Sequence, residues 1–84
     1  MIRYPSIAKV RLNEAVGAAV RSRRKEHGMT THAFAEALGV GQGHLTKLES
    51  GAQMFTIWQL YVATMVFDCT LDELVPVLEE LEVA

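Results

Sequence analysis

The amino-acid sequence predicts an all-α fold, a compact bundle of five helices in a chain of 84 residues. The first observation is a pair of short apolar stripes with helical spacing, Phe34 with Leu38 and then Leu45 with Leu48. The second is Gly39 between the two stripes, because glycine readily takes the left-handed conformation that ends a helix. Together they predict two helices joined by a tight turn, the second free to project from the bundle.

Capping residues mark the first two helices. Asn13 can cap a helix that runs to about His27, and Gly28 follows as its stop signal. Thr30 or Thr31 can cap the second helix, which ends at the glycine turn. Both assignments follow because a short polar side chain accepts a hydrogen bond from the free N–H groups of a first helical turn.

The third and fourth helices carry the same kinds of signal. We expect the third over residues 42–50, with Gly51 as its C-terminal glycine. Thr56 caps a fourth helix that runs through Phe67. No residue from Ser50 to Phe67 is charged, and the fourth helix is apolar around its whole circumference. Such a helix requires burial on every side, which is more than a chain of this size can provide.

This excess of apolar residues predicts a partner surface on the fourth helix. We expect an inward stripe made of Ile57, Leu60, Thr64 and Phe67. An outward group then forms a candidate homodimer interface: Phe55, Trp58, Tyr61, Val62 and Met65. An exposed apolar patch with aromatic residues is typical of protein–protein contacts. The alternative is that residues 77–83 fold back and cover this patch.

A fifth helix is predicted to begin at Thr70. Glu73 can reach back to the backbone N–H of Thr70, which completes a capping box. Pro76 ends or kinks this helix because proline lacks the N–H that a helix interior needs, and residues 77–81 can resume it.

Composition and charge indicate one small domain with unequal ends. Half of the residues are hydrophobic, enough for one modest core in 84 residues. Seven of the eight Lys and Arg residues lie in residues 1–27, whereas eight of the ten Asp and Glu residues follow. We therefore expect a basic N-terminal arm at 1–11, a single domain at 12–76 and a short acidic tail at 77–84.

Several classes of protein are excluded. No run of about 18 apolar residues predicts a membrane span, and the N-terminus lacks a signal-peptide core. The lone Cys69 cannot form an internal disulfide, which fits a reducing cytoplasm. The three histidines lack the spacing of a zinc site, and no nucleophile–base set or glycine-rich phosphate loop stands out. We expect no enzymatic activity, metal, cofactor or small-molecule substrate.

Five sequence blocks in order carry a resemblance to a known family. They are residues 16–24 (Val-Gly-Ala-Ala-Val-Arg-Ser-Arg-Arg), 34–35 (Phe-Ala), 38–40 (Leu-Gly-Val), the set Leu45, Leu48, Glu49 and Gly51, and residues 70–74 (Thr-Leu-Asp-Glu-Leu). With these blocks the chain resembles the Cro and phage-repressor type helix-turn-helix proteins, the XRE family. The resemblance implies a lambda-repressor-like DNA-binding domain whose third helix reads DNA.

The resemblance also implies roles for individual residues. It places a phosphate contact at Thr31 and base contacts at Gln42, Gly43, Thr46 and Lys47. By residue chemistry, Gln42 can pair with adenine, Lys47 can reach guanine or phosphate, and His44 can touch a phosphate. The family also pairs the residues that match Arg24 and Glu49 in a partly buried ion pair between the first and third helices.

These features predict a sequence-specific transcriptional regulator that binds duplex DNA as a homodimer on an inverted-repeat operator. The alternative is a helix-turn-helix-fold protein-interaction module, such as the antitoxin-like partner of another protein, with weak or no DNA binding. A nonspecific, nucleoid-type DNA binder is disfavoured by the net charge of −2. Retention on heparin or random duplex DNA at low salt discriminates between these classes.

Overall fold

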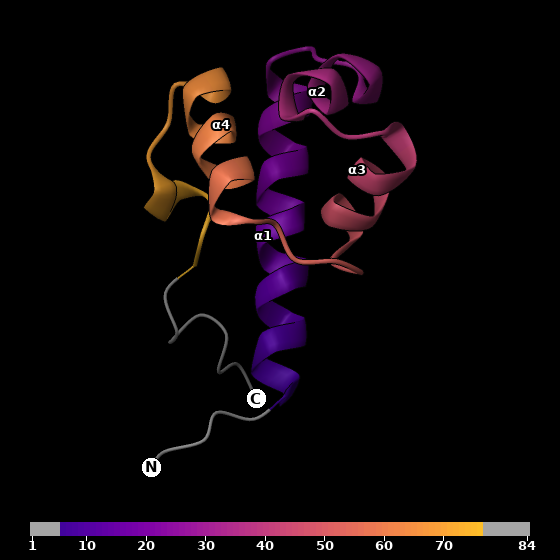
Figure 1. Ribbon diagram of the computed structural model, residues 1–84. Coiled ribbons are helices and arrows are strands. Elements are labelled where there is room, and N and C mark those ends of the chain that lie inside the picture. The colour runs from indigo at the N-terminus through magenta and orange to yellow at the C-terminus, as the bar shows by residue number, and fades with distance from the viewer. Residues whose placement is uncertain (1–5, 77–84) are drawn as a thin grey trace.

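The computed structural model describes residues 6–76 and shows an all-helical chain (Figure 1). Its elements are α1 (Ser6–Glu26), α2 (Thr31–Leu38), α3 (Gln42–Ser50), α4 (Ile57–Phe67) and a short 3-10 helix, η1 (Leu71–Glu73). The all-α prediction is confirmed. The number of helices is not, because the described residues form four α-helices and one 3-10 turn instead of five helices.

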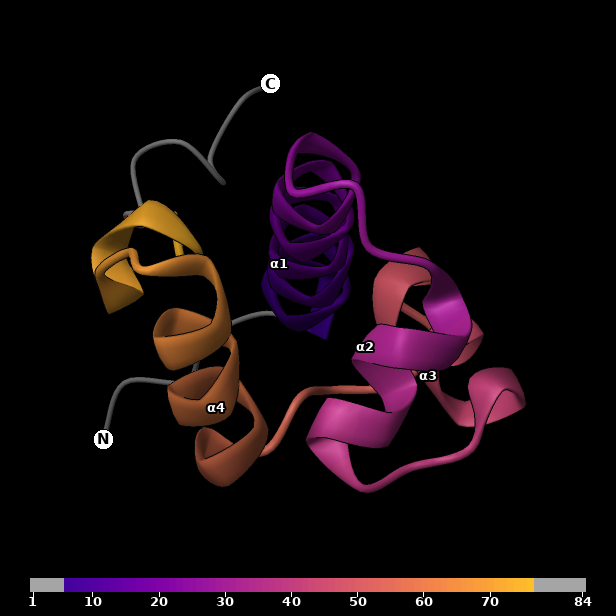
Figure 2. The ribbon, with the colours of Figure 1, turned by 90° about the horizontal axis from the view of Figure 1, so that it is seen from above.

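Helix α1 is the central element of the fold. Seen from above, α4 lies on one side of α1, and α2 and α3 lie on the other (Figure 2). Contacts join α1 to α3 and α4, and α2 to α3 and α4. The N-terminal turns of α1 extend beyond the other helices (Figure 1), which makes the molecule elongated, at 40 × 23 × 22 Å. Helix α1 therefore serves as the scaffold against which α3 and α4 pack, and α2 bridges these two helices.

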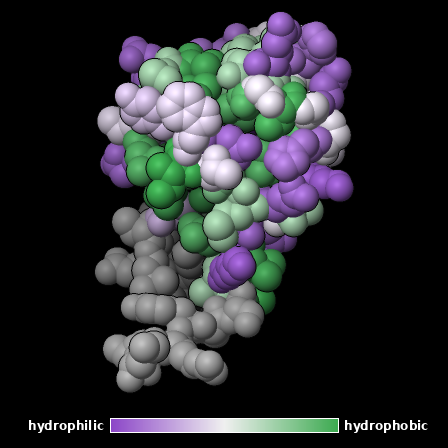
Figure 3. All heavy atoms as spheres, in the orientation of Figure 1, coloured by the Kyte–Doolittle hydropathy of each residue, from purple (hydrophilic) through white to green (hydrophobic). Residues whose placement is uncertain are grey.

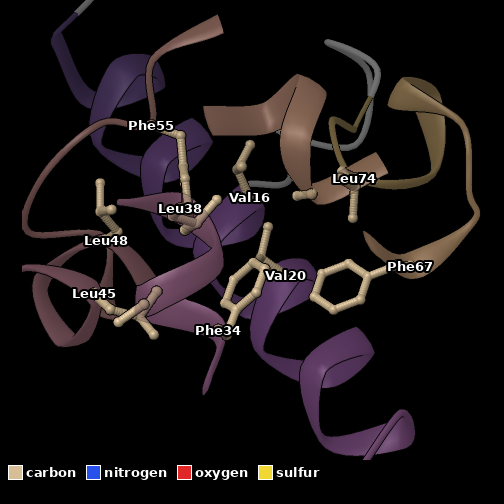
Figure 4. Packing of buried hydrophobic residues seen from close by; sticks show 11 residues of the cluster. Val16, Val20, Phe34, Leu38, Leu45, Leu48, Phe55, Phe67 and Leu74 are labelled. Carbon is tan, nitrogen blue, oxygen red and sulfur yellow. The ribbon is translucent and has the colours of Figure 1, made fainter. Parts of the chain in front are cut away.

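The core lies where all four helices meet around Val20, whose side chain is fully buried (Figure 4). The rings of Phe34 and Phe67 pack beside it with their centroids 4.9 Å apart, within the range of favourable aromatic pairs. The other buried hydrophobic residues are Val16, Ala35, Leu38, Leu45, Leu48, Phe55, Ala63 and Leu74. Both predicted stripes of α2 and α3 thus face this core.

The predicted caps position the helices. Thr30 caps α2 by accepting a hydrogen bond from the Ala33 N–H at 3.0 Å. Gly39 ends the helix with φ of 74°, in the left-handed region expected for the turn. Gly51 ends α3 in the same way, with φ of 86°. The turn between α2 and α3 therefore begins at Gly39, and α3 begins three residues later at Gln42.

The start of α1 differs from the prediction. The helix includes residues 6–12, so Asn13 is not its cap and residues 6–11 are not a separate arm. The physical reason is that residues 6–12 contain Ala, Lys, Arg and Leu with no glycine or proline, so nothing interrupts the helix there. Residues 1–5 of the expected arm lie outside the described residues.

The segment after α4 also differs from the prediction. The Thr70 N–H donates to Glu73 Oε2 at 2.8 Å, as the capping box requires, but only the 3-10 turn η1 follows. Leu74 then enters the core, and Pro76 comes two residues later with no N–H to continue a helix. The resumed helix at 77–81, the acidic tail at 77–84 and the covering segment at 77–83 lie outside the described residues.

Candidate nucleic-acid interface

Helix α3 has one buried face and one polar face. Leu45 and Leu48 are fully buried against the core. The opposite face is exposed and consists of Gln42, Gly43, His44, Thr46 and Lys47. Thr31, at the first position of α2, lies beside the start of α3 because its hydroxyl bonds to Gln42. The predicted DNA-contacting residues are therefore brought together on one surface.

Hydrogen bonds hold Gln42 at the start of α3. The Thr31 hydroxyl donates to Gln42 Oε1 at 3.1 Å. Gln42 Nε2 lies 3.1 Å from Nδ1 of His32, the second residue of α2. In addition, the Thr46 hydroxyl donates to the Gln42 backbone carbonyl at 3.0 Å. The Gln42 side chain is thus held by residues of α2 at the start of α3.

An ion pair attaches α3 to α1. Arg24 Nε donates to Glu49 Oε2 at 2.8 Å, and its second terminal nitrogen donates to Glu49 Oε1 at 3.2 Å. Arg24 also donates to the Met29 carbonyl at 2.9 Å, so the guanidinium bonds in three directions. The exposed fractions of Arg24 and Glu49 are 7% and 9%. This bidentate, buried geometry fixes the end of α3.

A close backbone approach supports the same junction. A Cβ atom built at Gly17 would lie 2.5 Å from the carbonyl oxygen of Glu49 and 2.6 Å from that of Leu48. Both distances are shorter than van der Waals contact allows. Only glycine therefore lets α1 pass this close to the C-terminal end of α3.

A hollow of about 230 Å³ opens beside the ion pair, at the junction of α1, α2 and α3. Its lining includes the exposed Arg21 and the hydroxyl-bearing residues Thr31, Thr46 and Ser50. The guanidinium of Arg21 can donate to an anionic oxygen there, such as that of a phosphate, whereas the hydroxyls of Thr31, Thr46 and Ser50 already donate within the protein. Arg21 was not among the predicted site residues, although its position three residues before Arg24 places both on one face of α1.

The side of the molecule formed by α4 has the opposite character. Its exposed large hydrophobic residues are Met54, Ile57, Trp58, Tyr61 and Met65, with exposed fractions from 51% to 86%. The rings of Trp58 and Tyr61 lie 6.0 Å apart. Figure 3 shows hydrophobic residues gathered on the side of α4 and hydrophilic residues on the side of α2 and α3. The two sides of α1 thus present two different surfaces.

Comparisons with known proteins identify this arrangement. The HTH_3 helix-turn-helix model matches residues 20–74, about two thirds of the chain. The chain belongs to the HTH_3 helix-turn-helix family. The predicted resemblance to XRE-type proteins is thereby confirmed, and the match begins at Val20 and ends at Leu74, two core residues. A comparison with curated protein sequences gives no match.

Solved structures support the family assignment. The clp gene regulator ClgR from Corynebacterium glutamicum is 33% identical, with a TM-score of 0.69 over 75% of this chain and 82% of the ClgR chain. A second ClgR crystal structure matches with a TM-score of 0.70 and 67% of that chain covered. An HTH_3 family transcriptional regulator from Vibrio cholerae is 21% identical, with a TM-score of 0.68 over 79% of this chain and 37% of that one, and shows the fold alone.

As a member of the HTH_3 family, the chain is a DNA-binding transcriptional regulator and not an enzyme. Within the described residues, no cluster of three His, Cys, Asp or Glu side chains could hold a metal ion. No helix in that part of the chain is long and apolar enough to cross a membrane.

Burial raises the pKa of the Cys69 thiol; Arg23 opposes the rise, and the carboxylates of Glu73 and Asp68 add to it. The thiol therefore stays protonated at neutral pH and is a poor nucleophile.

Two expectations for α4 of this HTH_3 domain are wrong. Phe55 was expected on the exposed surface, but it is 6% exposed and lies in the core. Ile57 was expected to face inward, but its exposed fraction is 86%, the largest among the exposed large hydrophobic residues. Val62 is half-buried against the core. The exposed face therefore keeps Trp58, Tyr61 and Met65 from the predicted set.

The cap of α4 explains both corrections. Thr56 Oγ1 accepts from the Gln59 N–H, and Gln59 Oε1 accepts from the Thr56 N–H at 2.8 Å. This capping box turns Gln59 inward, so the buried stripe consists of Gln59, Ala63 and Phe67. Phe55 and Leu60 occupy the positions of a hydrophobic staple around the cap, and they line one hollow. Ile57 is consequently left on the outer surface.

Proposed function

We propose that this chain regulates transcription in the cytoplasm by binding a specific inverted-repeat sequence in duplex DNA as a homodimer. The observation that carries the proposal is the exposed polar face of α3, held on a buried framework by the Arg24–Glu49 ion pair. An α-helix of this kind fits the major groove of B-DNA, where base edges can be distinguished.

The chemistry of the α3 face supports direct reading of bases. Glutamine can bond in a bidentate manner to adenine, and Gln42 is exposed at the first position of α3. Gly43 has no side chain, so the helix can approach the groove closely there. Lys47 can contact guanine or phosphate, and it is the single Lys or Arg after residue 27.

Residues around α3 supply the phosphate contacts. Arg21 and Thr31 line the hollow beside α3, and His44 is exposed on α3 itself. Phosphate contacts fix the register and orientation of a protein on the duplex, whereas base contacts specify the sequence. We therefore assign Thr31, Arg21 and His44 to positioning, and Gln42 and Lys47 to reading.

The exposed apolar face of α4 supports the homodimer. Ile57 and Tyr61 are four residues apart, and Trp58 and Met65 are seven apart, so these side chains share one stripe of the helix. Pairing this stripe with its copy removes aromatic and apolar surface from water. A two-fold dimer then places two α3 helices about one DNA turn apart, roughly 34 Å, which requires an inverted repeat.

Selection of bound fragments from a random duplex pool tests the proposal. The wild-type protein is expected to enrich an inverted repeat with half-site centres about 10 base pairs apart. The matched control is Gln42→Ala, which should enrich the same repeat with one position per half-site relaxed. Failure of the wild-type protein to enrich any sequence would overturn the proposal.

A second candidate function follows from the same α4 face. An exposed apolar stripe is also typical of a surface that binds a different protein, as in an antitoxin-like interaction module. In that case the excess of acidic residues after residue 27 should weaken DNA binding. Retention of the protein on duplex DNA at low salt, with release by salt, favours the regulator; passage without retention favours the interaction module.

A further inference from the structure

His32 takes part in the hydrogen bonding of α3 although it belongs to α2. Its Nδ1 lies 3.1 Å from Gln42 Nε2, and its Nε2 lies 3.7 Å from Glu36 Oε2, one turn further along α2. Both neighbours constrain the imidazole. The Gln42 amide nitrogen carries only donors, so Nδ1 must accept, and the Glu36 carboxylate favours the proton on Nε2. This arrangement corresponds to the tautomer of His32 with a bare Nδ1 and the proton on Nε2.

The two hydrogen-bond partners of the Gln42 side chain differ in which orientations of its amide they permit. The Thr31 hydroxyl can donate or accept, so it tolerates either orientation of the Gln42 amide. An unprotonated Nδ1 of His32 can only accept, so it tolerates only the orientation that presents Nε2. With the proton on Nε2, His32 holds the Gln42 amide in one orientation, whereas Thr31 alone would allow either.

The clamped amide still has one free position at each end. Nε2 has two hydrogens and gives one to His32, and Oε1 has two lone pairs and gives one to Thr31. One donor and one acceptor of the same amide remain for a ligand. Adenine presents the complementary pair in the major groove, the N7 acceptor and the N6 donor.

We propose that His32 is a positioning residue for base reading, which orients the Gln42 amide so that α3 prefers adenine at one position of each half-site. This inference rests on the proposed binding of duplex DNA by α3. Without His32 the Gln42 amide can rotate, and ordering it again on DNA reduces the preference. Ordering one such side chain on binding corresponds to a roughly 2- to 10-fold loss of affinity for the duplex that carries the preferred adenine.

Competition binding with fluorescent duplexes tests the assignment. Four probes are used. The first is the duplex selected by the wild-type protein, and the other three replace the adenine pair at one position with each of the other base pairs. That position is the one at which Gln42→Ala relaxes the sequence preference. His32→Ala should lower the ratio of affinities at that position by roughly 2- to 10-fold. Ratios at all other positions should stay unchanged.

Three further variants separate positioning from general damage. His32→Asn should restore the preference, because its Oδ1 can accept where Nδ1 did. His27→Ala is the matched control, since His27 is an exposed histidine whose Nδ1 lies against the Arg23 carbonyl of its own helix. His32→Ala should have no further effect on the ratio when combined with Gln42→Ala. An unchanged ratio in His32→Ala, or an equal loss of affinity for all four duplexes, would overturn the assignment.

A measurement without DNA distinguishes failure of this inference from failure of the proposed function. Nitrogen-15 NMR of the free protein should show His32 protonated on Nε2 and bare on Nδ1, with Gln42 side-chain amide signals that shift in His32→Ala but not in His27→Ala. The opposite tautomer would overturn the inference while DNA binding stands. If the NMR signals are as expected but the wild-type protein shows no sequence preference on DNA, the proposed function is overturned, and so is the role of His32 in base reading.

Discussion

Helices α3 and α4 lie on opposite sides of α1 (Figure 2) and each buries one face in the core, yet they expose opposite chemistry. Helix α3 presents amide, hydroxyl, imidazole and ammonium groups. Helix α4 presents aromatic and aliphatic side chains, with no charge anywhere along its length. The difference shows that one small core can support two surfaces of different chemistry. The polar surface suits DNA, and the apolar surface suits a second copy of the chain.

The two helices are also attached to the core by different means. A buried ion pair and a glycine contact fix α3 at its C-terminal end. Helix α4 is held by the packing of Ala63 and Phe67 in the core, while the Thr56–Gln59 capping box closes its own first turn. Substitutions at these attachments should therefore affect one helix more than the other.

The largest expected effect comes from breaking the attachment of α3. Arg24→Ala and Glu49→Ala should each lower the free energy of unfolding by roughly 3–5 kcal/mol, because each leaves a buried charge without its partner. The double variant should lose much less than the sum of the two. Urea unfolding of the four proteins gives the coupling energy.

Arg23→Ala is the control for this experiment. Its contact with Glu73 is 3.7 Å long and partly exposed, so its loss should cost about 1 kcal/mol or less. Losses of equal size in Arg23→Ala and Arg24→Ala, or additive losses in the double variant, would contradict the structural role of the pair.

A charge on α4 tests the other surface. Trp58→Glu should weaken dimerisation by at least about 2 kcal/mol, since exposed aromatic residues dominate such interfaces, while the helical content stays unchanged. Light scattering with circular dichroism measures both properties. Ala18→Glu adds the same charge at an exposed position of α1 and should remain dimeric. A Trp58→Glu protein with the wild-type mass would place the interface elsewhere.

Much of α3 could be predicted from the sequence, whereas the phase of α4 could not. The stripe Leu45 and Leu48 stands out in α3 because its other positions are polar or glycine. In α4 nearly every position is apolar, so periodicity cannot distinguish the buried face from the exposed one. In α4 the decisive signal is the cap. Thr56 with Gln59 three residues later predicts that Gln59 turns inward, and the position of Phe55 just before the cap predicts that Phe55 is buried.

Within the candidate site, residue identity was predictable but mutual contact was not. Helical spacing places Gln42, Thr46 and Lys47 on one outward face of α3. Spacing within one helix gives no information about contacts with another, so the bonds of Gln42 to Thr31 and His32 required the angle between α2 and α3. That angle is set by the turn at Gly39 and by packing in the core.

A pair of glycine substitutions gives a smaller effect and contrasts the α1–α3 junction with the exposed start of α3. Gly17→Ala should destabilise the protein by about 1–3 kcal/mol, because the new methyl group would overlap backbone atoms at the end of α3. Gly43→Ala should instead stabilise it by up to about 1 kcal/mol, since its new methyl group meets nothing within 4 Å. Thermal unfolding measures both; a stabilising Gly17→Ala would contradict the close approach of α1 and α3.

The smallest expected effect concerns a single charge. Lys47→Ala should weaken binding of the selected duplex and, if the ammonium group contacts phosphate, lower the slope of log K against log salt by about 0.9 per chain. Arg23→Ala removes a positive charge beside Glu73, away from α3, and should leave the slope unchanged. Equal slopes for Lys47→Ala and the wild-type protein would assign Lys47 to a base contact or to none.

The number of chains bound per duplex tests the division of labour between α3 and α4 most directly. Sedimentation equilibrium with the selected inverted repeat should give two chains per duplex for the wild-type protein at concentrations where Trp58→Glu gives one or none. One wild-type chain per inverted repeat, or two chains of Trp58→Glu bound as tightly as the wild type, would contradict the account.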